Sequence, residues 1–136
     1  MNDTDHVRMA LLTSDECFAL LETVPVGRIA YVSDGALQVF PVTFQVSAQR
    51  IVFQSAVGSK LDAAEMARAV AFEADAWDEE TRTGWSVVVR GPAHTVTDLE
   101  RLAVLDALDL DPWLKTTDMQ WVEIPVVDIS GRRLPP

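Results

Sequence analysis

Cysteine is nearly absent from this 136-residue chain, in which Cys17 is the only one. A lone cysteine excludes an intramolecular disulfide, and its place in an apolar helical stretch predicts a buried structural thiol rather than a nucleophile. Histidine is almost as scarce: His6 and His94 are far apart, and neither has a Cys or carboxylate partner at metal-ligand spacing. We therefore expect no metal site, and no Ser–His–Asp arrangement is recognisable in the sequence.

The chain also has few positively charged residues and lacks long apolar runs. The 11 Lys and Arg residues stand against 21 Asp and Glu residues, which gives a net charge of −10. This balance argues against a broad basic surface for nucleic acid or anionic lipid, although a locally basic pocket is compatible with it. No apolar run approaches the ~18 residues of a membrane helix, and the acidic start of the chain lacks the apolar core of a signal peptide. We expect a cytoplasmic protein that binds neither nucleic acid nor membrane.

Helix signals predict about three short helices. Two of them are capping boxes, in which an N-cap Thr is followed by Glu at N3: Thr13 with Glu16, and Thr97 with Glu100. The first helix is expected to end before Pro25 and the second to run to about Leu108. The third is expected to begin after Ser59, where strong helix formers follow.

Strand signals dominate the rest of the chain. Asp34-Gly35 is a strong signal for a two-residue hairpin turn, and Gly91-Pro92 predicts a bulge or bend within a long strand. We expect strands at residues 28–33, 36–46, 50–55, 70–77, 84–96 and 121–129. Strands and helices do not alternate regularly, so the pattern predicts a mainly β (α+β) fold whose six-stranded antiparallel sheet closes into a small barrel. Residues 13–136 form this single domain, after a flexible lead-in at residues 1–12.

Residues 51–64 carry the clearest functional signal. A short strand ending at Ser55 is followed by a turn at Gly58 and a helix with Ser59 as its N-cap. Lys60 then lies at the positive end of the helix dipole, where a cation is normally disfavoured. A bound phosphate would remove that conflict, because backbone N–H groups, the two hydroxyls and the ammonium group would converge on it. The alternative is an ordinary Ser-capped helix with a solvated lysine.

An ordered series of short sequence words covers nearly the whole chain from Leu11 to Arg133. These words are Val26–Ala30, Asp34-Gly35, Pro41–Phe44, Val57–Leu61, Val70–Asp75, Gly84–Gly91 and Ile129–Arg133. In this order they resemble the split-barrel family of pyridoxamine 5′-phosphate oxidase-like proteins, and in particular its small flavin-binding actinobacterial branch. The resemblance implies a homodimer of six-stranded split barrels, with FMN bound at two sites along the subunit interface.

The resemblance also assigns the cofactor-binding residues. The strand Phe40-Pro41-Val42-Thr43 would lie along the isoalloxazine ring and bond its pyrimidine edge through main-chain groups. Ser55, Ser59 and Lys60 would hold the phosphate, with the Leu61 N–H nearby, and Gln54 would add at most a neutral hydrogen bond. Of the four tryptophans, Trp113 is the best placed to cover the flavin across the dimer, and the alternative is an ordinary core or interface aromatic. Relatives often carry Arg and Thr where this chain has Gln54 and Ser55, and Asn where it has Thr43. These departures favour weak FMN affinity or a preference for a deazaflavin such as F420.

The sequence therefore predicts an FMN-dependent oxidoreductase that transfers hydride through flavin N5 to or from a small-molecule substrate. Vitamin B6 oxidases are expected to carry a C-terminal Arg–His pair, and the end of this chain, Arg132-Arg133-Leu134, lacks one. No side chain stands out as a general acid or base, and the catalytic residues are unknown. Arg28 and Arg90 are expected to pair with Glu73 or Asp75, with cofactor contact as the alternative. The rival interpretation is a non-catalytic dimeric module that binds flavin, deazaflavin or haem.

Overall fold

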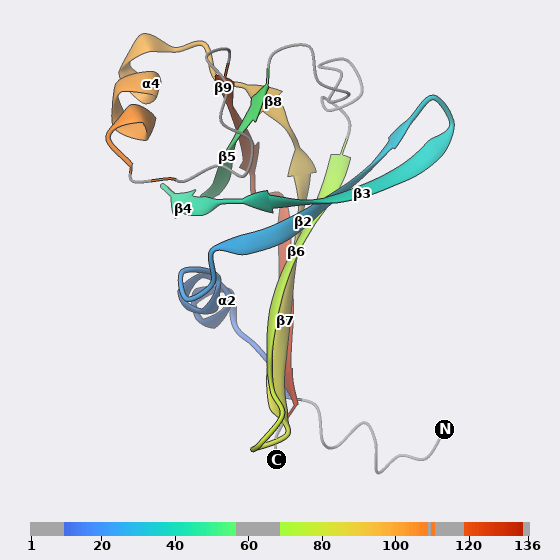
Figure 1. Cartoon of the computed structure of the whole chain (residues 1–136). Coiled ribbons are helices and arrows are strands. Elements are labelled where there is room, and N and C mark those ends of the chain that lie inside the picture. Colours follow the sequence, from blue (N-terminus) through green and yellow to red (C-terminus); the bar gives the residue numbers. More distant parts are fainter. Residues whose placement is uncertain (1–9, 57–68, 109, 111–118, 135–136) are drawn as a thin grey trace.

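The chain folds into two antiparallel sheets and two short helices in the computed structural model, which describes residues 10–56, 69–108, 110 and 119–134 (Figure 1). The first sheet has the order β1 (Ala10–Leu11), β10 (Asp128–Leu134), β7 (Thr83–Pro92), β6 (Ala69–Asp78), β2 (Val26–Ser33), β3 (Ala36–Thr43). The second has the order β4 (Gln45–Ser47), β5 (Arg50–Ala56), β9 (Met119–Pro125), β8 (His94–Thr95). The helices are α2 (Ser14–Leu21) and α4 (Leu99–Asp106). The predicted mainly β antiparallel class is confirmed, while the third helix, at Ser59, falls outside the described residues.

Three of the predicted strands are wrong as single strands, because each bends and continues in the other sheet. Segment 36–46 divides at Phe44 into β3 and β4, segment 84–96 divides at Ala93 into β7 and β8, and segment 121–129 divides after Pro125 into β9 and β10. Strands that change sheets form the corners of packed β structures. Phe44 is 3% exposed and Ala93 is fully buried, so the bends turn apolar residues inward. The expected interruption at Gly91-Pro92 lies beside the second bend.

The predicted Asp34-Gly35 hairpin turn is confirmed. Both residues have positive φ, 52° and 74°, as a type I′ turn requires, and β2 and β3 pair from Ser33 with Ala36 to Val26 with Thr43. This hairpin extends from the body of the molecule (Figure 1). The turn between β4 and β5 also has two residues of positive φ, Ala48 and Gln49, although neither is glycine.

The first predicted helix cap is confirmed and the second is wrong by one residue. The Glu16 N–H donates to Thr13 Oγ1 at 3.2 Å, and the Thr13 N–H donates to Glu16 Oε1 at 2.9 Å, which is the complete capping box. At α4 the cap is Asp98, whose carboxylate accepts the Arg101 N–H at 3.0 Å. The carboxylate of Asp98 therefore takes the position that the sequence assigned to Thr97, and α4 ends at Asp106 rather than Leu108.

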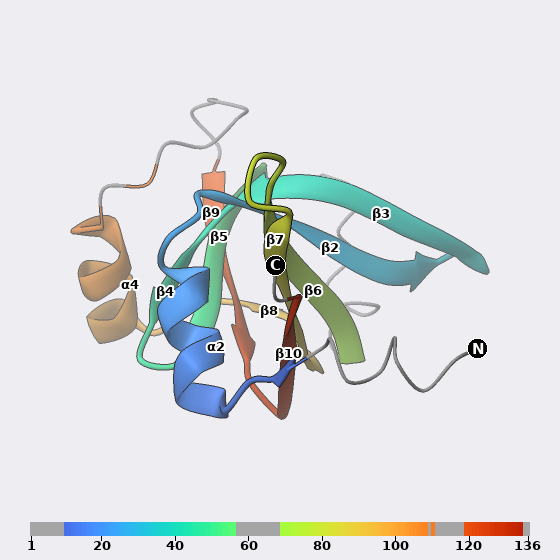
Figure 2. The ribbon, with the colours of Figure 1, turned by 90° about the horizontal axis from the view of Figure 1, so that it is seen from below.

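Two apolar clusters hold the sheets and helices together. The main core lies between the sheets and is closed by α2; it includes Ile29, Phe72, Val87, Ile51, Phe53, Ile124, Cys17 and Leu21. A smaller cluster lies between α4 and the outer face of the four-stranded sheet, and it contains Val52, Val96, Leu105 and Trp121. In both views β4 lies between the two helices (Figures 1 and 2). Cys17 is buried, as predicted, and burial raises the pKa of its thiol.

Candidate functional site

The open edge of β3 is the structural feature that matches the predicted flavin strand. β3 is the last strand of its sheet, and among the described residues no strand pairs with its outer side. The Phe44 N–H donates to the Pro25 carbonyl at 3.1 Å, so the main-chain groups of residue 44 face β2. Because these groups alternate along a strand, the N–H and C=O of Thr43 and the C=O of Pro41 face the open edge. The open edge therefore presents one hydrogen-bond donor, the Thr43 N–H, between two carbonyl acceptors.

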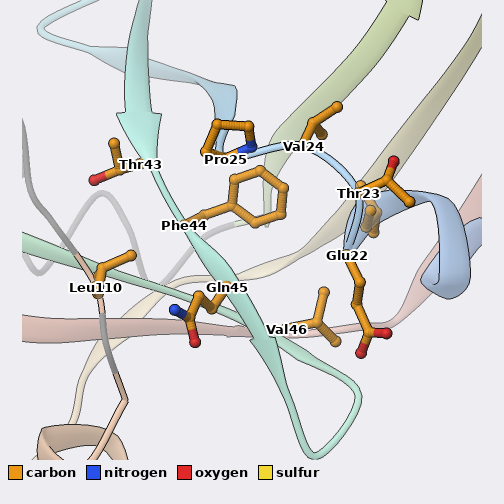
Figure 3. A pocket seen from close by; sticks show the side chains of 10 residues that line it. Glu22, Thr23, Val24, Pro25, Thr43, Phe44, Gln45, Val46 and Leu110 are labelled. Carbon is orange, nitrogen blue, oxygen red and sulfur yellow. The ribbon is translucent and has the colours of Figure 1, made fainter.

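A cavity of ≈ 550 Å³ adjoins the end of this edge (Figure 3). It lies between the segment that joins α2 to β2 and the bend from β3 into β4. Its lining residues are Leu21, Glu22, Thr23, Val24, Pro25, Thr43, Phe44, Gln45, Val46 and Leu110. Among the described residues of this lining, Glu22 is the one ionisable residue, and the other polar side chains are Thr23, Thr43 and Gln45. The cavity is large enough for part of a ring system with a few polar groups to orient it.

The predicted strand residues lie in different surroundings. Thr43 lines the cavity, whereas Val42 is buried in the main core. Phe40 is half-buried with its ring edge-on to Tyr31, at 5.7 Å between centroids, and Pro41 is exposed opposite Arg28. Their side chains do not form one surface, so the main chain of β3 is the part that this strand offers a ligand.

Two of the predicted phosphate residues follow each other on β5 and point to opposite faces. Ser55 is 7% exposed and lies on the face of Ile51 and Phe53, which belong to the main core. Gln54 is half-buried on the face of Val52, which packs with α4. The other predicted phosphate residues, Ser59, Lys60 and Leu61, lie outside the described residues, as does Trp113. The phosphate site as a whole remains a prediction.

Arg28 pairs with both carboxylates proposed for it, on the outer face of the six-stranded sheet. Its Nη1 lies 3.4 Å from Glu73 Oε1 and 3.6 Å from Asp75 Oδ2. Burial raises the pKa of Glu73 to about 7, with the hydrogen bond and charge of Asp75 acting in the same direction and Arg28 acting against them. Arg90 does not share this pairing. It lies opposite Ala71 on β6 but bonds Asp128 of β10 at 3.1 Å, because Asp128 is its register partner on the other side.

A second charged group, centred on Glu123 of β9, was not expected from the sequence. Glu123 is 3% exposed, and its carboxylate accepts hydrogen bonds from Arg50 and from Arg101, whose Nε lies 3.0 Å from Oε2. His94 Nε2 lies 3.3 Å from Oε1. Burial alone would raise the pKa of Glu123, but the bonds and charges of Arg101 and Arg50 lower it below its ordinary value. The available signal was a single acidic residue within the apolar stretch Trp121–Pro125.

Two further kinds of site, a metal centre and a membrane span, concern the described part of the chain. No group of three or more His, Cys, Asp or Glu side chains there could hold a metal ion. None of the described helices has the length and apolar character needed to cross a membrane.

The chain matches known proteins over almost its whole length. A family model described as pyridoxamine 5′-phosphate oxidase matches residues 13–133. The FAD binding protein from Mycobacterium smegmatis is 40% identical with a TM-score of 0.80, and the match covers 91% of this chain and 98% of that one. A conserved protein of unknown function, DIP1874 from Corynebacterium diphtheriae, is 34% identical with a TM-score of 0.78, over 93% and 98% of the two chains.

A further relative also matches most of the chain. The uncharacterized protein Rv0080 of Mycobacterium tuberculosis is 34% identical over 128 residues, which cover 90% of this chain and 84% of the relative. The match to the family model spans all described strands except β1 and the last residue of β10. Together with the two-sheet fold and the ordered sequence words, these matches confirm the resemblance: the chain belongs to the pyridoxamine 5′-phosphate oxidase family.

Proposed function

We propose that this protein binds a flavin nucleotide along the open edge of β3 and uses it for oxidation–reduction of a small molecule. The observation that carries the proposal is the main-chain edge at Pro41 and Thr43, which no described strand pairs, beside a cavity of ≈ 550 Å³. The pyrimidine edge of a flavin carries an N–H between two carbonyl oxygens; the Thr43 N–H can donate to one of those oxygens, while one of the carbonyls beside it accepts the flavin N–H. A 40% identical relative is named as an FAD binding protein, which supports a flavin ligand.

The chain's own residues would bind and orient the ring rather than react with substrate. When bound, the flavin supplies the hydride chemistry at its N5. Thr43 would fix the ring through its main chain, and Phe44, which lines the cavity beside it, would give that cavity an apolar wall. Ser55, Ser59 and Lys60 are proposed to hold the phosphate next to the ribityl chain, which FMN and FAD share, with Gln54 and the Leu61 N–H beside them.

We further propose that the protein forms a homodimer in which Trp113 of one subunit covers the flavin of the other. Several large apolar side chains are exposed on the β2–β3 hairpin, with 58% of Val32, 73% of Leu37 and 60% of Val39 accessible. An apolar surface of this kind marks an interaction site in a protein that is otherwise strongly charged. A second copy covering it would bury well over ~1,000 Å² in total, the scale of a specific interface.

The test is a titration of purified protein with FMN, FAD, riboflavin and deazaflavin F420, followed by flavin fluorescence or absorbance. Lys60→Ala should weaken FMN and FAD at least tenfold, the scale of one charge-assisted hydrogen bond, and leave riboflavin unchanged. Equal losses for riboflavin and FMN would show that Lys60 acts through the fold. If none of the four ligands binds, the proposal is wrong.

A non-catalytic flavin-binding, deazaflavin-binding or haem-binding module is the second candidate. The observation that favours it is the lining of the cavity, where Glu22 is the one ionisable residue among the described ones and is exposed. Bleaching of the bound flavin by NADPH, with recovery in air, would support the oxidoreductase. A flavin that binds tightly and is reduced by neither NADPH nor NADH would favour the module.

A further inference from the structure

The charged group around Glu123 lies beside a second cavity, separate from the one next to Thr43. This cavity has a volume of ≈ 420 Å³ and is lined by Ala48, Arg50, His94, Thr95, Val96, Thr97, Asp98, Arg101 and Glu123. Arg50 begins β5 and Ser55 lies near its other end, so about five residues, roughly 17 Å of strand, separate Arg50 from the proposed phosphate site. The described linings of the two cavities have no residue in common. The second cavity therefore does not belong to the proposed flavin site.

The buried carboxylate fixes the positive groups in place. Arg101 is the most constrained, because its Nε bonds Glu123 and its two terminal nitrogens bond the hydroxyl and carbonyl oxygens of Ser47, both at 3.2 Å. Only 17% of the Arg101 side chain is exposed. This anchoring holds α4 against β9 and the end of β4, and the shared Glu123 carboxylate brings Arg101, Arg50 and His94 together around one point.

Arg50 and His94 still have polar atoms that face outward. Arg50 uses Nη1 for Glu123 and His94 uses Nε2, while 43% and 49% of their side chains are exposed. The lining carries two guanidinium groups, those of Arg50 and Arg101, and two carboxylates, those of Glu123 and Asp98, so its formal charges balance. The Asp98 carboxylate also lines the cavity, but it is bonded to the N-terminal turn of its own helix. In a chain of net charge −10, this concave surface is therefore locally neutral, and the nitrogens of Arg50 and His94 that do not contact Glu123 are its available hydrogen-bonding groups.

We propose that this cavity binds a small oxyanion, a phosphate or carboxylate group of a small molecule, through Arg50 and His94. A guanidinium group matches such an anion with two parallel N–H donors, and the bonds are stronger because both partners are charged. Arg101 and Glu123 act as positioning residues, which keep Arg50 and His94 in place without touching the ligand. This proposal concerns a site beyond the proposed flavin site and does not depend on it.

The test uses the fact that the chain has only two histidines. Correlation spectra of the imidazole C–H groups are recorded at pH 8 while inorganic phosphate, or separately succinate, is added at constant ionic strength made up with NaCl. The His94 signal should shift and saturate with at least one of the two anions, while the His6 signal reports general effects of the solution. A His6→Gln variant assigns the two signals.

Matched variants decide whether the site is the one proposed. Arg50→Gln should raise the apparent Kd at least tenfold, since one charged hydrogen-bonding partner is lost, and Arg90→Gln should leave it unchanged. Arg90 is a suitable control because it is exposed and pairs with Asp128 outside this cavity. Lys60→Ala should also leave the His94 titration unchanged, because Lys60 belongs to the proposed flavin phosphate site. Failure of the His94 signal to saturate with either anion, or an equal Kd in Arg50→Gln, would overturn the proposal.

Discussion

Glu73 makes the stability of this protein depend on pH in a direction opposite to that of most carboxylates. Its pKa rises from 4.5 to about 7, first because of burial and then because Asp75 lies beside it. In the folded protein Glu73 therefore keeps its proton at pH values where the unfolded chain has lost it. The resulting stabilisation is fully present below pH 4.5 and is lost as the pH rises through about 7.

The size of this effect follows from the same two values. A difference of about 2.5 in pKa corresponds to at most roughly 3.4 kcal/mol. The Glu73 side chain is 34% exposed, so solvent screening reduces the expected change to about 1–2 kcal/mol. Glu73→Gln removes the titrating group and should abolish this part of the pH dependence. The free energy of unfolding of the wild type, relative to Glu73→Gln, should fall by that amount between pH 4.5 and pH 8.

Urea unfolding followed by tryptophan fluorescence at pH 4.5, 5.5, 6.5 and 8 measures the difference. Asp75→Asn should reduce the pH dependence as well, because it removes the neighbouring charge that helps to raise the pKa of Glu73. Glu80→Gln, at an exposed loop carboxylate, should leave it unchanged. A constant difference between wild type and Glu73→Gln over this range would show that Glu73 titrates normally and that the reasoning is wrong.

Three other changes test separate parts of the structure. Gly27→Ala should lower the free energy of unfolding in urea by about 3 kcal/mol, because a Cβ there would overlap the Phe72 ring and lie 2.9 Å from the Glu73 carbonyl. Gly35→Ala has open space around it and should lower the free energy of unfolding by about 1 kcal/mol, from its positive φ alone. Equal losses for the two variants would contradict the packing argument. The wild type should sediment as a dimer at micromolar concentration and Leu37→Glu as a monomer; a monomeric wild type would refute the shared site. Gln54→Arg should tighten FMN about tenfold without affecting riboflavin; unchanged FMN affinity would mean that residue 54 stays on the α4 face of β5.

Local signals were sufficient wherever a few neighbouring residues decide the structure. The Asp34-Gly35 turn was predictable because only residues that tolerate positive φ form a type I′ turn, and the Thr13–Glu16 box was predictable because both bonds lie within one helical turn. At α4 two neighbouring side chains, Thr97 and Asp98, could each cap the helix. The sequence could not decide between them, because the choice depends on how α4 packs against the sheet.

The strand bends and the Glu123 group depend on contacts that are distant in sequence. Apolar alternation continues through Phe44, so the local pattern shows no bend there, and at Ala93 the Gly91-Pro92 signal predicts a bend without showing that the chain passes to the other sheet. The partners of Glu123 are 73, 29 and 22 residues away, and no local spacing connects them. Phe40–Thr43 could be placed by the family resemblance, but the open edge beside them is visible only when the order of strands is known.

The three bent strands also determine which parts of the protein can unfold separately. Since β3–β4, β7–β8 and β9–β10 each contribute to both sheets, neither sheet can separate without disturbing strands that the other one shares. Gly91 tightens this connection, because its missing side chain lets β7 approach the Pro125 carbonyl at the end of β9. Partial unfolding of one sheet is therefore costly, and amide hydrogen exchange in β7 and β9 should proceed only through global unfolding. Among the described strands, the tip of the β2–β3 hairpin extends beyond this shared framework, and in a subunit whose hairpin no second copy covers it should exchange by local fluctuations.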